Sequence, residues 1–322
     1  MQTAVVNRGK SVRLGSNRGV LAIGPLVGLL ATLVVSLLAG CGGPGTSTAP
    51  TPAGTVAPHP TSPAPISPSA GTQPSATRTP DTRSDTNGAT PAPAWLGTRV
   101  LPIGPDGYGV VTATPPELRN RRIISEDLLP PPPDGRFRSR ITAVPAEVVR
   151  RSSWSAACPV ALRDLRYVTV SFLGFDGRAH TGELLLNRTV ANDVVTVFHK
   201  LFTVGWPIEE MRITSPADLS AAPTGDGNDT SAFACRPVRG ATSWSQHAYG
   251  LAIDVNPFDN PYVAGRTVLP ELAAFYTDRH RGLAGMNTPG SPPVAAFRSI
   301  GWGWGGDYTS KKDWMHFSST GK

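Results

Sequence analysis

The chain has 322 residues, with 30 Lys and Arg against 23 Asp and Glu, and proline and glycine together make up about a fifth of it. Four of the basic residues precede residue 41, where no acid occurs, so the formal net charge falls from +7 to +3 beyond that point. This balance excludes a strongly basic mature protein and argues against nucleic acid as a partner.

The N-terminus, residues 1–40, has the features of an export signal. Its basic residues precede an uncharged apolar run over residues 19–40, as in secretory signal peptides. The run ends in the sequence LAGC at residues 38–41, which resembles the bacterial lipoprotein box. We therefore predict a lipoprotein signal peptide, lipidation of Cys41 and a location on the outer face of the cell membrane. An uncleaved anchor is the alternative, because about 20 apolar residues can span a bilayer.

Residues 41–93 read as the lipidated cysteine followed by a tether. From residue 42 to residue 93, 43 of 52 residues are Pro, Thr, Ser, Ala or Gly, and none is aromatic. Such a segment buries too little apolar surface to offset its ordering entropy, so we predict a disordered spacer. A glycosylated stalk is the alternative, since Thr and Ser are abundant.

Residues 94–150 combine turn signals, the four prolines at 130–133 and a set of arginines. We expect an extended segment that wraps the following domain and has little regular structure. Its arginines are expected to be solvated or paired with acids, with an anionic wall polymer as the alternative contact.

Residues 151–322 are enough for one compact domain with a substantial core. Alternation and turn signals predict strands at 167–173, 180–186, 208–213, 250–255 and 314–318, helices at 191–204 and 294–300, and a polar loop at 215–230. Strands with segregated helices indicate an α+β fold.

Two short stretches of this domain bring histidine close to aspartate in the sequence. They are SQHAYGLAID, with His247 and Asp254, and DWMHF, with Asp313 and His316. Two imidazoles and one carboxylate suit a catalytic zinc ion, which also needs an open position for water. A further carboxylate must then carry the proton to the leaving amine. We interpret the other histidines of the domain as structural, namely His180, His199 and His280.

Together, the two stretches closely resemble the signature of the zinc D-alanyl-D-alanine carboxypeptidase family. This family includes the VanY-type and VanX-type peptidases and the related L-alanyl-D-glutamate endolysin peptidases. The resemblance implies that His247, Asp254 and His316 bind one Zn²⁺ and that Asp313 is the catalytic acid/base. It also implies a hedgehog/DD-peptidase-like fold, in which a small antiparallel sheet with flanking helices carries the zinc site.

The family also has an arginine upstream of the first histidine that binds the carboxylate of the substrate. Arg236 occupies such a position, and a guanidinium holds a carboxylate bidentately at any working pH. Arg239 and Arg212 are alternatives. Ser245 either fastens the loop that carries His247 or simply caps a turn.

Lipidation of Cys41 leaves two cysteines, Cys158 and Cys235, in an oxidising compartment. We predict a disulfide between them, worth about 4 kcal/mol in the chain-entropy model. A cysteine nucleophile is the rival, but neither cysteine has an evident His or Asn partner in the sequence.

These features predict a monomeric cell-envelope zinc metallopeptidase that hydrolyses amide bonds of peptidoglycan stem peptides. The carboxypeptidase and dipeptidase branches of the family typically have Glu where this chain has Asp313. Asp at this position looks more like the L-Ala-D-Glu endopeptidase branch. The sequence does not decide which bond of the stem peptide is cleaved. The alternative is a non-catalytic, zinc-containing lipoprotein that binds the cell wall, although the presence of Asp313 argues against it.

Overall fold

A computed structural model of the protein describes residues 87–322. The predicted signal peptide, Cys41 and the predicted tether up to residue 86 lie outside the described residues. Across residues 87–322, no helix is both long and apolar enough to cross a membrane.

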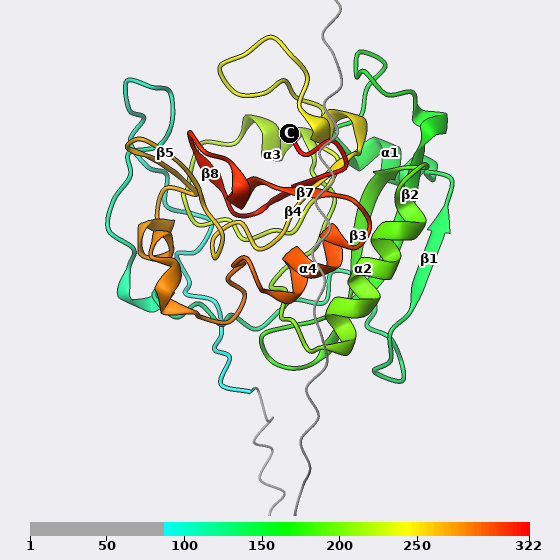
Figure 1. The fold of residues 1–322 in the computed structure, drawn as a ribbon, viewed down its shortest axis with the longest axis horizontal. Coiled ribbons are helices and arrows are strands. Elements are labelled where there is room, and N and C mark those ends of the chain that lie inside the picture. The colour runs from blue at the N-terminus through cyan, green and yellow to red at the C-terminus, as the bar shows by residue number, and fades with distance from the viewer. Residues whose placement is uncertain (1–86) are drawn as a thin grey trace, which may run out of the picture. The chain divides into compact units, whose positions relative to one another are not determined.

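The described strands form three small antiparallel sheets, which lie among short helices (Figure 1). The first sheet, in the order β1-β2-β3, contains β1 (Ser139–Thr142), β2 (Leu165–Leu173) and β3 (Ala179–Asn187). The second sheet, in the order β4-β9-β7, contains β4 (Ala252–Asp254), β9 (His316–Ser318) and β7 (Gly303–Trp304). The third sheet, in the order β6-β5-β8, contains β6 (Thr267–Leu269), β5 (Tyr262–Ala264) and β8 (Lys312–Asp313).

The helices are short, and several are single 3₁₀ turns. The α-helices are α1 (Ala146–Arg151), α2 (Ala191–Thr203), α3 (Pro216–Ser220) and α4 (Pro292–Arg298). The 3₁₀ helices are η1 (Pro116–Leu118), η2 (Leu162–Asp164), η3 (Gln246–Tyr249), η4 (Ala273–Thr277), η5 (Arg279–Arg281) and η6 (Gly305–Asp307).

One apolar core joins the first and second sheets through α2 and α4. Alternate residues of β2, among them Val168 and Val170, point to this core, as does the buried face of α2 with Val194 and Phe198. The second sheet contributes Phe317, whose ring stacks on Phe297 of α4 at 4.3 Å between centroids. Burial of these faces on one another places the second sheet, which carries the candidate site, against the β2–β3 hairpin.

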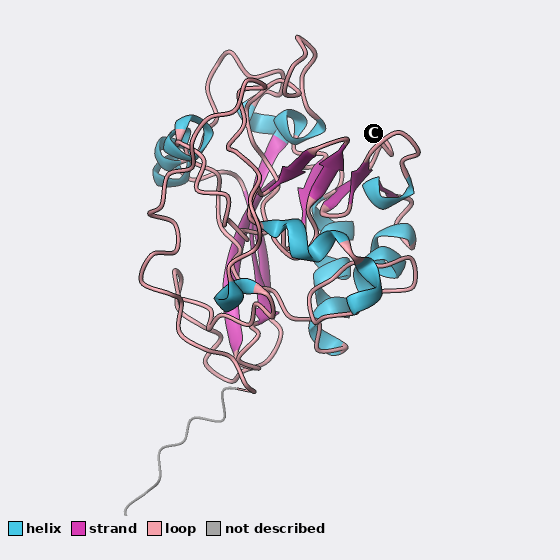
Figure 2. Ribbon diagram, turned by 90° about the vertical axis from the view of Figure 1, so that its left-hand side faces the viewer, coloured by secondary structure: helices cyan, strands magenta, loops and turns pink. Residues whose placement is uncertain are grey.

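The segment that precedes α1 packs along the third sheet and η4. Leu118 and Ile123 are buried with Phe258 and Tyr276 in a second apolar cluster. Arg121 also forms a buried ion pair with Glu209, with a donor–acceptor distance of 2.6 Å. Figure 2 shows this side of the molecule as long loops running in front of the strands. These contacts attach the N-terminal segment to the domain through both apolar and charged groups.

The predicted α+β class is confirmed, as are the β2–β3 hairpin, α2 and α4, and the strand predicted at 250–255 is found as the shorter β4. The predicted final strand is shorter and begins at His316. Within or at the end of residues 94–150, the structure adds three short elements that were not predicted, η1, β1 and α1. β1 pairs with β2 and extends the first sheet.

The predicted strand at 208–213 is wrong. The segment makes only isolated bridges, Leu173 to Pro207 and Glu210 to Asp229. Its apolar residues are buried in two different clusters, Ile208 and Met211 in the main core and Ile213 in a smaller one, while Glu209 turns to Arg121. The apolar residues of this segment therefore reflect burial against separate parts of the fold rather than pairing in a sheet.

Candidate metal centre

His247 lies in η3, directly before the strand that carries Asp254. The hydroxyl of Ser245 accepts a hydrogen bond from the His247 backbone N–H at 3.3 Å, so this serine caps the turn. Gly250 ends the turn with φ of +67°, a conformation that favours glycine. A Cβ at this position would lie 2.7 Å from the backbone nitrogen of Asn187. The glycine thus allows the His247 turn to dock closely on the end of β3.

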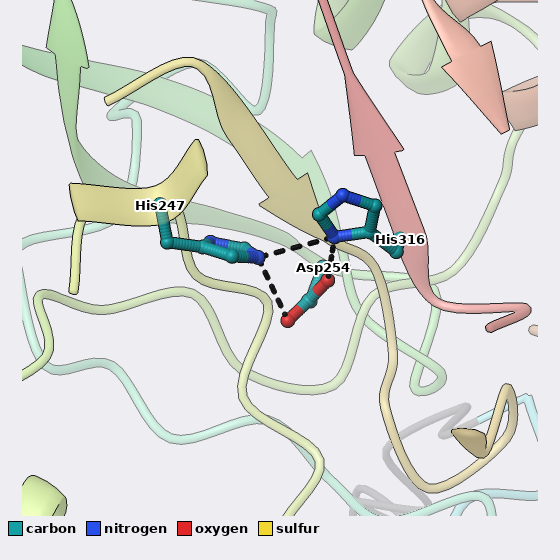
Figure 3. Close-up of side chains that lie close together, drawn as sticks. All are labelled: His247, Asp254 and His316. Carbon is teal, nitrogen blue, oxygen red and sulfur yellow. Dashed lines mark hydrogen bonds and ion pairs between the residues drawn. The ribbon is translucent and has the colours of Figure 1, made fainter. Parts of the chain in front are cut away.

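Asp254 and His316 are held by the backbone pairing of two strands. β4 and β9 run antiparallel, and Asp254 at the end of β4 lies directly opposite His316 at the start of β9. The turn η3 contacts β4, so that side chains from three separate segments meet (Figure 3). Residues far apart in the sequence are therefore placed together by register and by the docking of one turn.

The three side chains present one ligand atom each to a common point. His247 Nε2 lies 3.2 Å from Asp254 Oδ2 and 3.2 Å from His316 Nδ1, and His316 Nδ1 lies 3.1 Å from Asp254 Oδ1. Tetrahedral ligands at about 2.0–2.1 Å from a zinc ion are separated by about 3.3–3.4 Å. His247 and His316 are buried and Asp254 is half-buried, and the spacing and the N, N, O donor set of the group fit a single zinc ion.

Backbone carbonyls orient both imidazoles. His247 Nδ1 donates to the carbonyl of Ala232 at 2.5 Å, and His316 Nε2 donates to the oxygen of Lys322 at 3.1 Å. With one ring nitrogen of each histidine protonated in this way, the lone pair of the other nitrogen points at the shared site. Such outer contacts fix the tautomer and raise the basicity of metal-binding histidines.

The charges of the three groups stabilise one another. Burial acts to raise the pKa of Asp254, but the charges and hydrogen bonds of His247 and His316 outweigh it and hold this pKa below its ordinary value. Burial acts to lower the pKa of His316, but the hydrogen bond and charge of Asp254 raise it to about 9. At neutral pH the ion pair with Asp254 therefore favours a second proton on His316, on the nitrogen that faces the site, and a metal ion that binds there would have to displace this proton.

Asp313 stands next to this group without being part of it. It lies in β8, opposite Tyr262 of β5, three residues before His316. Its Oδ1 atom is buried and has no hydrogen-bond partner among the described residues. Burial and then the charge of Asp254 raise the pKa of Asp313 to about 6, although the charge of His316 opposes them. A carboxyl group of this kind can exchange a proton near neutral pH.

Arg236 lies between the disulfide and the turn that carries His247. Its backbone carbonyl accepts the Ser245 N–H at 3.3 Å, and its guanidinium donates only to the Pro237 carbonyl at 3.4 Å. Among the described residues it has no acidic partner within ion-pair distance. Burial lowers its pKa, and the charges of Asp254 and Asp313 oppose this shift. The guanidinium therefore has no counter-charge within the described part of the chain and is available to an anionic ligand.

The two alternative arginines differ from Arg236. Arg212 is already paired with Glu210 at 2.6 Å and with Asp218 at 2.8 Å, so its charge is balanced by carboxylates of the protein. Arg239 lies over the ring of Tyr108, 5.5 Å from its centroid.

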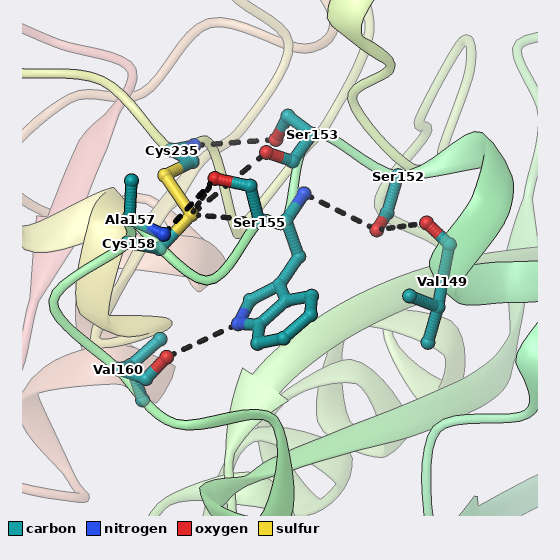
Figure 4. Close-up of a disulfide and its surroundings, with 9 residues drawn as sticks. Val149, Ser152, Ser153, Ser155, Ala157, Cys158, Val160 and Cys235 are labelled. Atoms are coloured by element: carbon teal, nitrogen blue, oxygen red, sulfur yellow. Dashed lines mark hydrogen bonds between the residues drawn. A yellow bond between two sulfur atoms is a disulfide. The ribbon is translucent and has the colours of Figure 1, made fainter.

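The structure contains the predicted disulfide between Cys158 and Cys235 (Figure 4). The backbone N–H of Cys235 also donates to the hydroxyl of Ser153 at 3.2 Å. Nearby, the Trp154 indole donates to the carbonyl of Val160 at 3.1 Å. The disulfide therefore braces the backbone directly before Arg236.

The other histidines of the domain lie in different surroundings. His180 is fully buried between the carboxylates of Asp127 and Asp176, at 2.8 and 3.2 Å. His199 stacks on Phe137 at the surface of α2. The sequence did not reveal the carbonyls of Ala232 and Lys322 as orienting groups, because a backbone acceptor leaves no signature in residue type. It also did not reveal Tyr262 and Tyr308, which border Asp313.

A comparison with known protein families finds one match, which covers the part of the chain that carries the candidate metal ligands. Residues 239–319 match a family model described as D-alanyl-D-alanine carboxypeptidase. The matched region contains His247, Asp254, Asp313 and His316, and it begins after Arg236. The match supports the interpretation that this chain is a peptidase. Comparisons with curated proteins and with solved structures give no match.

Proposed function

We propose that the protein is a zinc peptidase that hydrolyses amide bonds of peptidoglycan stem peptides. The observation that carries this proposal is the convergence of His247 Nε2, Asp254 and His316 Nδ1 within a region that matches a peptidase family. Zinc bound by these atoms would supply Lewis acidity, which polarises the scissile carbonyl and makes water a stronger nucleophile at neutral pH.

Asp313 is the group that moves the proton in this proposal. Its buried, unpartnered Oδ1 is free to accept a proton from the attacking water and to pass it to the leaving amine. A pKa of about 6 leaves Asp313 mostly ionised at neutral pH, yet basic enough to take up a proton during the reaction. Asp313 is therefore the acid/base, and His247, Asp254 and His316 are the ligands.

Arg236 is the group that positions the substrate. A free carboxylate of the peptide would pair with its guanidinium, which has no acidic partner among residues 87–322. Such a charge-assisted bidentate contact fixes both the position and the direction of the peptide relative to the metal. The carboxylate is either the C-terminus of the stem peptide or the α-carboxylate of its D-glutamate, depending on the bond that is cut.

The proposed place of action is the outer face of the cell membrane. The sequence of residues 1–41 supports export and lipidation at Cys41, and the disulfide suits an oxidising compartment. A disordered tether after Cys41 would let the domain reach the wall polymer while it stays anchored.

Mass spectrometry of stem peptides incubated with the full-length, zinc-loaded protein tests this function. We expect new peptide termini to appear with the wild-type protein and not with Asp313→Asn, although zinc analysis should find one ion in both. The mass of the products identifies the bond. One bound zinc without any product from the wild-type protein would instead support the alternative, a non-catalytic lipoprotein that binds the cell wall.

A further inference from the structure

The ring nitrogen of His316 that faces away from the metal group is covered by a short segment, residues 319–322. His316 is buried, whereas Thr320, Gly321 and Lys322 are exposed. His316 Nε2 donates to the backbone oxygen of Lys322 at 3.1 Å. An exposed segment thus supplies the hydrogen-bond acceptor of a buried candidate metal ligand.

The imidazole of His247 is oriented by a more deeply embedded group. Its Nδ1 donates to the carbonyl of Ala232, which is buried in the main core. The neighbouring Ser231 is joined to Asp254 by an antiparallel bridge. A displacement of Ala232 would require this core to open, whereas a displacement of Lys322 would not. Of the two orienting contacts, the one at His316 is therefore the one that can change within the folded domain.

Ser318 holds the 319–322 segment in place. Its hydroxyl donates to the Lys322 oxygen at 2.8 Å and accepts the Lys322 N–H at 3.0 Å. Its carbonyl accepts the Gly321 N–H at 3.3 Å. Ser318 is itself fully buried in β9, two residues after His316. The Lys322 oxygen is therefore fixed by Ser318 and accepts a hydrogen bond from His316 at the same time.

The 319–322 segment also rests on Gly303 of β7, which pairs with Ser318. A Cβ at Gly303 would lie 2.5 Å from Gly321 Cα, so a side chain here would force one of the two backbones to move. Glycine is required at this position by the close approach of the segment. A serine hydroxyl and the absence of a side chain thus seat the segment on the second sheet.

We propose that the 319–322 segment sets the metal affinity of the site, with Ser318 as the positioning residue that holds it against His316. While the Lys322 oxygen accepts the Nε2–H bond, this proton stays on Nε2 and the Nδ1 lone pair is directed at the metal position. When the segment is displaced, the ring loses its fixed orientation and binds the ion more weakly. This inference rests on the proposed function, since it takes zinc as the bound ion, and it adds a means of regulating that site.

Zinc affinity, measured on the full-length protein by competition with a chromophoric chelator, tests the inference apart from hydrolysis. We expect Ser318→Ala to bind zinc about 10- to 100-fold more weakly, the usual effect of losing an outer contact to a ligand. Ser171→Ala is the matched control. The buried Ser171 hydroxyl holds Arg138 in the same way, accepting its N–H at 3.0 Å and donating to its carbonyl at 3.3 Å, but it lies in the first sheet. Ser171→Ala should keep the wild-type affinity.

Gly303→Ala displaces the segment by a second route, with the Ser318 hydroxyl intact, and should also weaken zinc binding. Its control is Gly301→Ala, because Gly301 has φ of +80° and no described atom lies within 4 Å of its Cβ position. Denaturant unfolding of the metal-free proteins shows whether each variant is folded. In zinc-loaded protein with isotope-labelled histidine, the NMR signal of the His316 Nε2–H should exchange faster with water in Ser318→Ala and Gly303→Ala than in the two controls.

Wild-type zinc affinity in both Ser318→Ala and Gly303→Ala overturns the inference, even if the wild-type protein cleaves stem peptides. An equal loss of affinity in Ser171→Ala and Ser318→Ala also overturns it, because the effect would then follow stability rather than the position of the segment. A wild-type protein that binds no zinc overturns it as well. Loss of affinity in either variant relative to its control supports the inference even if no peptide is cleaved.

Discussion

Asp254 and His316 face each other across the antiparallel β4–β9 pair, with Asp254 Oδ1 3.1 Å from His316 Nδ1. Opposed residues in such a pair are neighbours on the same face of the sheet. A slip of one residue in register would turn one of the two side chains to the other face. Two of the three candidate ligands are thus placed by backbone pairing, and only His247 depends on the docking of a separate turn.

Substitutions in the site should separate metal binding from proton transfer. His247→Ala, Asp254→Ala or His316→Ala removes one of three ligands, so both bound zinc and peptide hydrolysis should be lost. Asp313→Ala leaves the ligands in place, so zinc should remain while the rate falls at least about 100-fold. Zinc analysis and product formation on the same samples check this. If Asp313→Ala loses zinc as readily as His316→Ala, the division of roles is incorrect.

Gly250→Ala should destabilise the fold more than a positive φ alone explains. The left-handed conformation costs a non-glycine residue about 1–2 kcal/mol. At Gly250 the new Cβ would also meet the backbone nitrogen of Asn187 at 2.7 Å. Gly240→Ala is the matched control, because Gly240 has φ of +74° and no atom near its Cβ position. Denaturant unfolding should give a larger loss for Gly250→Ala, and equal losses would contradict the close approach.

Removal of the disulfide should weaken the domain without removing its metal ligands. The bond joins cysteines separated by 77 residues, and a native disulfide of this kind contributes about 2–4 kcal/mol. The double variant Cys158→Ser, Cys235→Ser should therefore unfold at lower denaturant concentration and still bind zinc. Thiol titration of the wild-type protein under denaturing, non-reducing conditions should detect neither cysteine. Detection of both thiols in exported protein would contradict the bond.

The free energy of unfolding should fall as pH rises, because a buried carboxyl group away from the metal centre loses its proton. Burial and then the charge of Glu209 raise the pKa of Asp259 from 3.8 to about 8. Between these values the folded protein retains a proton that the unfolded chain releases. The stabilisation from this proton is complete at low pH and is lost across this window, by at most about 1.4 kcal/mol per pH unit.

Asp259→Asn removes that proton and should reduce the loss of stability between pH 5 and pH 8, measured by denaturant unfolding. The matched control is Asp307→Asn, which removes an exposed carboxylate paired with Arg298 and should leave the pH dependence unchanged. An identical pH dependence of Asp259→Asn and the wild-type protein would show that Asp259 ionises normally.

Lipidation at Cys41 should decide where the protein is found. The wild-type protein should partition into the membrane fraction with an acylated N-terminal cysteine, whereas Cys41→Ser should lack the acyl group. Mass spectrometry of the mature N-terminus checks this. An unmodified Cys41, or a mature protein that begins elsewhere, would exclude the lipoprotein assignment.

The sequence alone was sufficient for the elements with strong local signals. The alternation of β2 and β3 around the turn at 174–177 and the helical spacing of α2 predicted these elements closely. The residues His247, Asp254, Asp313 and His316 were also singled out from two short stretches. Ligand residues are visible in a sequence because the chemistry of a metal site restricts residue type, and short spacings restrict local geometry.

Only the tertiary structure decided how distant segments complete the site. It left Arg236 without an acidic partner among the described residues, and gave the backbone oxygens of Ala232 and Lys322 their orienting roles. It also turned the segment at 208–213 away from strand pairing. None of these results follows from local pattern, because each depends on which surfaces are buried against one another when the whole chain packs.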